Sequence, residues 1–126
     1  MEEPNRIGLT ATTTAQLDEL LEELNPMEGE EGTRLIKFDI YRLVVSLGIK
    51  NKVSAPTLDE KSQNSLRVSE VDDEGVFYAA LENSGLVPDG TPIYEYIERL
   101  AEQGIKELYQ TFRATGQLPF EEYFTG

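Results

Sequence analysis

Apolar residues recur every three or four positions in two stretches of the chain, which predicts two amphipathic helices. In the first stretch, leucines alternate with acidic residues, so we expect a helix over residues 14–24 with an acidic, solvated face. The second stretch predicts a longer helix over residues 92–114, with Thr91 as its N-cap and Pro92 at its first position. Gly104 interrupts the apolar stripe of this helix. We expect close packing against a neighbouring element to compensate for its poor helix propensity.

Two other segments are also expected to be helices, but they lack the clear separation of an apolar face from a polar face. The segment between Thr33 and Gly48 is apolar on most sides, which predicts a central buried helix that Thr33 caps and Gly48 ends. Residues 74–83 predict a shorter helix. The acids just before it, Asp72 among them, would favour the positive end of its dipole.

Short strands and a capping pattern complete the list of elements. Polar and apolar residues alternate over residues 6–10, and again around residues 66–71, so each segment predicts a short strand. Thr13 and Gln16 have the spacing of a capping box, which places the start of the first helix at Thr14.

These elements predict one mainly α domain over residues 1–126, with about four helices and one or two short strands. A chain of this length can bury roughly two-thirds of its extended surface, so its core needs neither disulfides nor a metal. We expect an acidic, mobile loop near residues 27–32 and a long polar and basic loop near residues 49–67.

The chain has no cysteine and no histidine. This composition excludes disulfides, thiol chemistry, zinc sites built on these residues and nucleophiles activated by histidine. No Gly-rich phosphate-binding motif occurs either. We therefore expect a protein that is not an enzyme and has no cofactor and no metal site. The acidic N-terminus and the lack of a long apolar run predict a cytoplasmic protein without membrane contact.

The net charge of −13 disfavours binding to nucleic acid, but the charge is unevenly distributed. Residues 33–69 are basic and lie between acidic ends. Their side chains, with one arginine from the N-terminus, form a candidate nucleic-acid contact made of Arg6, Arg34, Lys37, Arg42, Lys50 and Lys52. The alternative is that Lys50 and Lys52 stabilise a helix C-terminus, while the others pair with acids of the first helix.

Two interpretations involving DNA remain open on the sequence. The order strand, helix, helix over residues 6–48 is similar to a ribbon-helix-helix regulator, in which Arg6, Gly8 and Thr10 would face outward and read base edges. Alternatively, the acidic residues could form rows that imitate the phosphates of DNA.

Three motifs resemble the small E component and other small proteins of the Dnd DNA-phosphorothioation systems. They are Asn-Arg-Ile followed by a leucine helix (residues 5–17), an aliphatic helix with Leu-Gly and a basic turn (residues 40–52), and a Glu-, Ala- and Gly-containing helix (residues 98–108). The resemblance extends over about residues 34–115, and Leu100 occupies a position where the family has tyrosine. The E component is thought to engage DNA through lysines, whereas this chain is mostly acidic.

The resemblance implies a non-catalytic accessory or adaptor protein of a prokaryotic DNA-modification system linked to anti-phage defence. Because the chain is acidic, we expect its partner to be a larger, basic protein subunit rather than DNA. The C-terminal aromatic residues Phe120, Tyr123 and Phe124 are the expected partner-binding residues. A homo-oligomer stays an open alternative.

Overall fold

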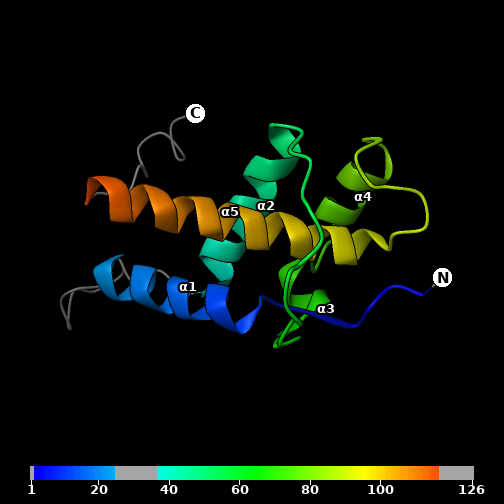
Figure 1. Ribbon diagram of the computed structural model, residues 1–126. Helices are drawn as coiled ribbons and strands as arrows, with labels where there is room; N and C mark the ends of the chain where they lie inside the picture. Colours follow the sequence, from blue (N-terminus) through cyan, green and yellow to red (C-terminus); the bar gives the residue numbers. More distant parts are fainter. Residues whose placement is uncertain (1, 25–36, 117–126) are drawn as a thin grey trace.

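Figure 1 shows the computed structural model of the chain, which describes residues 2–24 and 37–116. The helices are α1 (Ala11–Leu24), α2 (Lys37–Lys50), α3 (Val68–Val71), α4 (Val76–Glu82) and α5 (Ile93–Thr115), and the strands are β1 (Arg6–Ile7) and β2 (Leu66–Arg67). The mainly α single domain expected from the sequence is thus confirmed. The described residues form five helices instead of about four, because the short α3 lies where the second strand was expected to continue.

The other large helices pack against α5. In Figure 1, α1 lies alongside α5 and runs in the same direction, whereas α2 crosses α5 steeply. The predicted stripe of α5 is buried at Ile97, Leu100, Ala101, Ile105 and Leu108. Burial of each large aliphatic side chain contributes about 1.5–3 kcal/mol relative to exposure, so this stripe makes a large contribution to stability.

At the point where α2 crosses α5, the two backbones approach closely. A Cβ atom at Gly104 would lie 2.6 Å from the Cβ atom of Val44, which is closer than two carbon atoms can approach. The expected packing of Gly104 against a neighbour is therefore confirmed. The prediction that Gly48 ends α2 is wrong. Gly48 lies within this helix and faces Leu100. The predicted cap Thr33 and the acidic loop near residues 27–32 lie outside the described residues.

A two-stranded antiparallel sheet joins the N-terminus to the middle of the chain. Arg6 lies opposite Arg67, and Ile7 lies opposite Leu66. The strand predicted over residues 6–10 is shorter in the structure, and a single bridge to Ser62 extends the pairing to Thr10.

The loop over residues 51–65 connects α2 to β2 and is bound to α5 through Tyr96. The Tyr96 hydroxyl accepts a hydrogen bond from the Ala55 N–H and donates one to the Val53 carbonyl oxygen, both at 3.0 Å. Ala55 is buried against the core. The loop thus has a defined path across α5 without regular secondary structure of its own.

Two helices begin at residues that differ from those predicted. The Thr10 hydroxyl oxygen accepts a hydrogen bond from the Thr13 N–H at 3.3 Å, so Thr10, and not Thr13, precedes and caps α1. The predicted capping box with Gln16 is not formed, and the Gln16 Oε1 atom is buried without a partner among the described residues. At α4, both Asp72 carboxylate oxygens accept backbone N–H bonds at 3.0 Å, which confirms the expected role of that acid.

The N-terminus of α5 is capped by Glu3 instead of the predicted Thr91. The Glu3 carboxylate accepts hydrogen bonds from the N–H groups of Ile93 and Tyr94, both at 2.9 Å. The capping residue is thus 90 positions away from the helix in sequence, so no local sequence pattern could reveal it.

Replacing Glu3 by alanine should lower the free energy of unfolding by about 0.5–2 kcal/mol, because the capped N–H groups of α5 lose their acceptor. Glu2→Ala removes the same charge from the neighbouring exposed residue and should change stability by less than about 0.5 kcal/mol. Urea denaturation followed by circular dichroism measures both. Equal effects of the two variants would contradict the capping role.

Gly104→Ala should destabilise the fold by about 1–3 kcal/mol, although alanine is the better helix former. The Val44 Cβ atom cannot rotate away, so α2 and α5 must separate. Gln110→Ala, at an exposed position on the same helix, should change stability by less than about 0.5 kcal/mol. A Gly104→Ala protein as stable as the wild type in urea would show that the helices can separate freely.

Candidate functional site

Glu98 is a buried acidic side chain that faces the N-terminal segment from α5. It is only 8% exposed. Its Oε2 atom accepts hydrogen bonds from the Gly8 N–H at 2.9 Å and from the Ser62 hydroxyl at 2.6 Å. The carboxylate therefore joins three segments of the chain, namely α5, the residues after β1 and the loop before β2.

Glu102 lies one turn further along α5 and is only 4% exposed. Its two oxygens accept hydrogen bonds from the N–H of Thr10 at 3.1 Å and from the hydroxyl of Thr10 at 2.9 Å. The Lys106 Nζ atom lies 3.3 Å from Oε2 and partly compensates its charge. Glu98 and Glu102 thus hold residues 8–10 against α5, through bonds that charged groups make stronger.

Tyr41 of α2 completes this buried polar cluster from the other side. Its hydroxyl donates a hydrogen bond to the Gly8 carbonyl oxygen at 3.0 Å, and its side chain is completely buried. Burial, and then the charges of Glu98 and Glu102, raise the pKa of Tyr41 well above its usual value. Tyr41 therefore stays protonated and keeps the proton that it donates to the Gly8 carbonyl oxygen.

Burial also raises the pKa of the Glu98 carboxyl above its usual value, although the hydrogen bonds from Ser62 and Gly8 act in the opposite direction. The neighbouring carboxylates of Glu95 and Glu102 raise the pKa of Glu98 further. A perturbed carboxyl of this kind is a frequent component of active sites. In this cluster, however, the donors around Glu98 and Glu102 come from the chain itself, so the arrangement binds the N-terminal segment to α5.

Sequence reasoning assigned no structural role to Glu98 or Glu102 and missed this cluster. One signal could have revealed it: Glu98 and Glu102 are four residues apart and directly follow the buried Ile97 and Ala101. They therefore border the apolar stripe instead of lying opposite to it.

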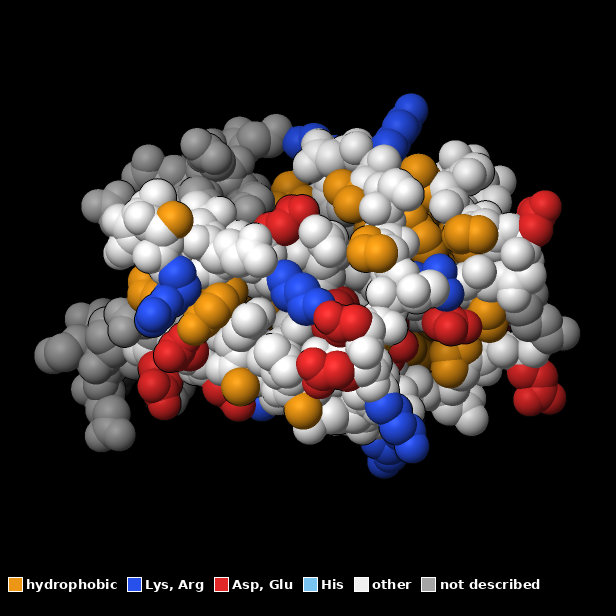
Figure 2. Space-filling model, viewed as in Figure 1, with side chains coloured by type: hydrophobic (Ala, Val, Ile, Leu, Met, Phe, Trp, Pro, Cys, Tyr) orange, Lys and Arg blue, Asp and Glu red, His pale blue; other side chains and the backbone are white. Residues whose placement is uncertain are grey.

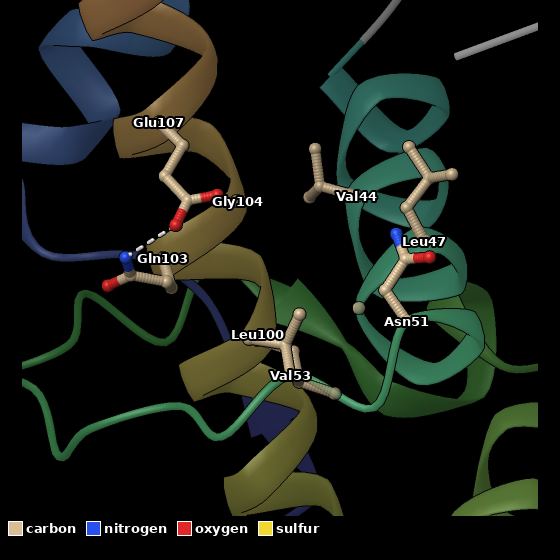
Figure 3. A pocket seen from close by; sticks show the side chains of 9 residues that line it. Val44, Leu47, Asn51, Val53, Leu100, Gln103, Gly104 and Glu107 are labelled. Atoms are coloured by element: carbon tan, nitrogen blue, oxygen red, sulfur yellow. Dashed lines mark hydrogen bonds between the residues drawn. The ribbon is translucent and has the colours of Figure 1, made fainter. Parts of the chain in front are cut away.

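A pocket of about 80 Å³ opens between α2 and α5 beside Gly104. Figure 3 shows its wall of Val44 and Leu47 on α2, of Asn51 directly after α2, and of Leu100, Gln103 and Glu107 on α5. The Gln103 Nε2 atom donates a hydrogen bond to Glu107 Oε1 at 2.9 Å, so the polar groups of α5 satisfy each other. The pocket is much smaller than typical cofactor sites of about 300–1,000 Å³, and it suits one aliphatic side chain.

Lys37 and Arg42, two of the predicted nucleic-acid contacts, are held by other parts of the chain. The Lys37 Nζ atom lies 3.0 Å from Asp18 Oδ1, which is the kind of pairing with the first helix that the alternative interpretation predicted. The Arg42 guanidinium group donates hydrogen bonds to the backbone carbonyl oxygens of Glu70 and Val71. These contacts fix Arg42 between α2 and α3.

The remaining predicted cations lie in different parts of the molecule. Lys37 is the first residue of α2 and Lys50 the last, so the rise of the helix separates them by about 20 Å, with Lys52 just beyond. Arg6 lies on β1, which pairs with β2 and not with α2. Figure 2 shows Lys and Arg side chains scattered over the visible face and separated by acidic ones. The structure therefore does not gather the described members of this set into one face.

The ribbon-helix-helix interpretation is wrong. Only Arg6 of the three proposed reading residues is exposed, whereas Gly8 and Thr10 are buried. β1 is also occupied by β2 of the same chain, so it is not available for an intermolecular ribbon. The reason is that Glu98 and Glu102 bind residues 8–10 from inside the fold.

Arg34 and the predicted partner-binding residues Phe120, Tyr123 and Phe124 lie outside the described residues. Within residues 2–24 and 37–116, no three acidic side chains are placed so that they could hold a metal ion. In the same part of the chain, no helix combines the length and hydropathy needed to cross a bilayer.

Comparison with models of protein families, with curated proteins and with solved structures finds no match to this chain.

Glu98→Gln should stabilise the protein at neutral pH, because glutamine can accept the same two hydrogen bonds without a buried charge. The folded-state pKa of Glu98 is raised, so the wild type loses stability as the pH rises from about 4.5 through that pKa. The difference in unfolding free energy between variant and wild type should therefore grow from pH 4.5 to pH 7, by about 1.4 kcal/mol for each unit of pKa shift. Urea titrations across this pH range measure the difference in unfolding free energy. A difference independent of pH would refute the raised pKa of Glu98.

Proposed function

We propose that this chain is a non-catalytic accessory or adaptor protein of a prokaryotic DNA-modification system linked to anti-phage defence. It acts by binding a larger, basic protein subunit of that system. Its sequence resemblance to small Dnd-system proteins over about residues 34–115 provides the biological context. The distribution of charge on the described surface provides the physical argument.

The observation that carries the proposal is the outward acidic face of α1. Asp18, Glu19 and Glu22 are exposed on this helix, and Figure 2 shows acidic side chains gathered over it. A compact acidic face attracts a basic protein surface over the Debye length and orients it before contact. The pocket beside Gly104 could then receive one aliphatic side chain of the same partner.

The arrangement of the basic residues argues against direct DNA binding. A DNA-binding protein needs several cations that contact the phosphates together, whereas Lys37 is paired with Asp18 and Arg42 with backbone carbonyl groups. The Lys37–Asp18 pair also interrupts the acidic row of α1, which disfavours an imitation of DNA phosphates.

Catalysis is not needed to explain the unusual groups of this fold. Glu98 and Glu102 accept hydrogen bonds from the N-terminal segment, and the buried Tyr41 hydroxyl donates to the same segment. Their burial thus has a structural purpose that is consistent with a binding protein.

The tagged full chain, expressed in its native host, should co-purify with a protein encoded beside DNA-modification genes, and nuclease treatment should not remove that protein. Glu19→Lys with Glu22→Lys should lower its recovery at least about tenfold, because two attractive charges become repulsive. The matched control, Glu74→Lys with Glu82→Lys, changes the same charge at exposed positions around α4 and should leave recovery within about twofold.

Deletion of residues 117–126, which removes Phe120, Tyr123 and Phe124, should abolish partner binding while circular dichroism shows an unchanged helical content. Equal recovery of the partner by the truncated chain would refute the role of this segment.

Recovery of DNA alone, lost at high salt and in a Lys50→Glu, Lys52→Glu variant, would refute the adaptor function and support a DNA-binding regulator. Light scattering of the pure chain tests for a homo-oligomer.

A further inference from the structure

Two arginines face each other on the small sheet. Arg6 of β1 lies directly opposite Arg67 of β2 in the antiparallel register. The Val68 N–H donates to the Asn5 carbonyl oxygen at 3.0 Å, so Asn5 and Val68 form the hydrogen-bonded pair beside them. Arg6 and Arg67 therefore occupy a non-hydrogen-bonded position, where the Cβ atoms of a pair are about 4.5–5.5 Å apart and the side chains leave the same face.

This juxtaposition is unfavourable without a negatively charged group nearby. Like charges directly opposite each other destabilise a strand pair. Both arginines are exposed, and neither has a carboxylate within ion-pair distance among the residues that the structure describes. By contrast, Lys37, Arg99 and Lys106 each have an acidic partner.

The two arginines border one surface depression of about 720 Å³, together with the polar side chains of Asn5 and Ser69. Glu3 and Asp72 also border it, but their oxygens already accept hydrogen bonds from the N–H groups that begin α5 and α4. Those acids are therefore directed at helix ends and form no ion pair with either guanidinium group.

We propose that Arg6 and Arg67 together bind the phosphate group of a small phosphate monoester in this depression. Each guanidinium group presents a planar pair of donors that matches two oxygens of a phosphate, and two such groups balance a dianion. The volume of the depression exceeds that of inorganic phosphate and lies in the range of small-molecule sites, so the monoester carries a polar organic group that reaches Asn5 and Ser69.

A small ligand fits this surface better than a nucleic-acid strand. Asp73 borders the depression, Glu2 and Glu95 lie around the adjacent one, and an extended polyanion would have to pass these carboxylates. A compact dianion reaches the arginines without doing so. This site is independent of the adaptor function proposed above, because neither arginine belongs to the acidic face of α1.

The experiment is a titration of the ¹⁵N-labelled full chain with glycerol 3-phosphate and with inorganic phosphate, at constant ionic strength and pH 7.5, followed by amide chemical shifts. We expect saturable shifts confined to residues 5–7 and 66–69, with tighter binding of the monoester. Arg6→Gln and Arg67→Gln should each weaken binding at least about tenfold, as expected for the loss of a hydrogen-bonding charged group. Arg113→Gln removes an exposed arginine from α5 and should change affinity by less than about twofold.

Two further variants show which property of the site determines the affinity for phosphate, and amide spectra control for misfolding. Arg6→Lys keeps the charge and loses the planar pair of donors, so it should weaken binding less than Arg6→Gln but measurably. Asp73→Asn removes a repulsive carboxylate and should strengthen binding. Amide spectra of all variants should otherwise superimpose on that of the wild type.

A short single-stranded oligonucleotide, with and without a 5′-phosphate, distinguishes the source of the phosphate. The proposal requires that the terminal phosphate strengthens binding at Arg6 and Arg67. Equal binding of both oligonucleotides would refute a monoester site and indicate contact with phosphodiesters. Shifts spread over all exposed cations, or unchanged affinity in both glutamine variants, would equally overturn the proposal.

Discussion

The close approach of α2 and α5 at Gly104 is the constraint on which the rest of the structure depends. With no side chain at this position, the Val44 Cβ atom contacts the backbone of α5 directly, and Gly48 allows Leu100 to approach α2 in return. The crossing brings Tyr41 of α2 to the side of α5 that carries Glu98 and Glu102. A larger residue at position 104 would move α2 outward and weaken every contact on both sides of the crossing.

The polar cluster around Glu98 and Glu102 performs a task that apolar packing could not perform. Residues 8–10 form only a short extended segment, and their backbone groups would be buried without partners if α5 were apolar at these positions. The two carboxylates provide acceptors for the Gly8 and Thr10 N–H groups, and Tyr41 provides a donor for the Gly8 carbonyl group. The buried carboxylates thus cost free energy, but they hold the residues after β1 in one position. That position in turn aligns β1 with β2.

The same internal bonds decide which charges remain on the surface. Lys37 and Arg42 are bound to the chain itself, so the basic segment read from the sequence does not form a basic face in the described structure. The acids of α1 face outward, and two arginines on the sheet remain without acidic partners among the described residues. The acidic face of α1 and the arginine pair of the sheet are two different surface features, and we propose a different ligand for each, a basic protein and a small phosphate.

The sequence by itself determined the helices that have a strong apolar period, the close packing of Gly104 and the cap that Asp72 makes at α4. These features depend on residues that are neighbours in the chain or on one helix face, where spacing carries the information. The tertiary structure decided the cap of α5, which comes from Glu3, and the burial of Glu98, Glu102 and Thr10. It also ended the second strand at Arg67 and placed Arg6 opposite it. Each of these features is a contact between segments far apart in the sequence, and whether an acid or an arginine is buried, paired or exposed depends on which partner the fold brings to it.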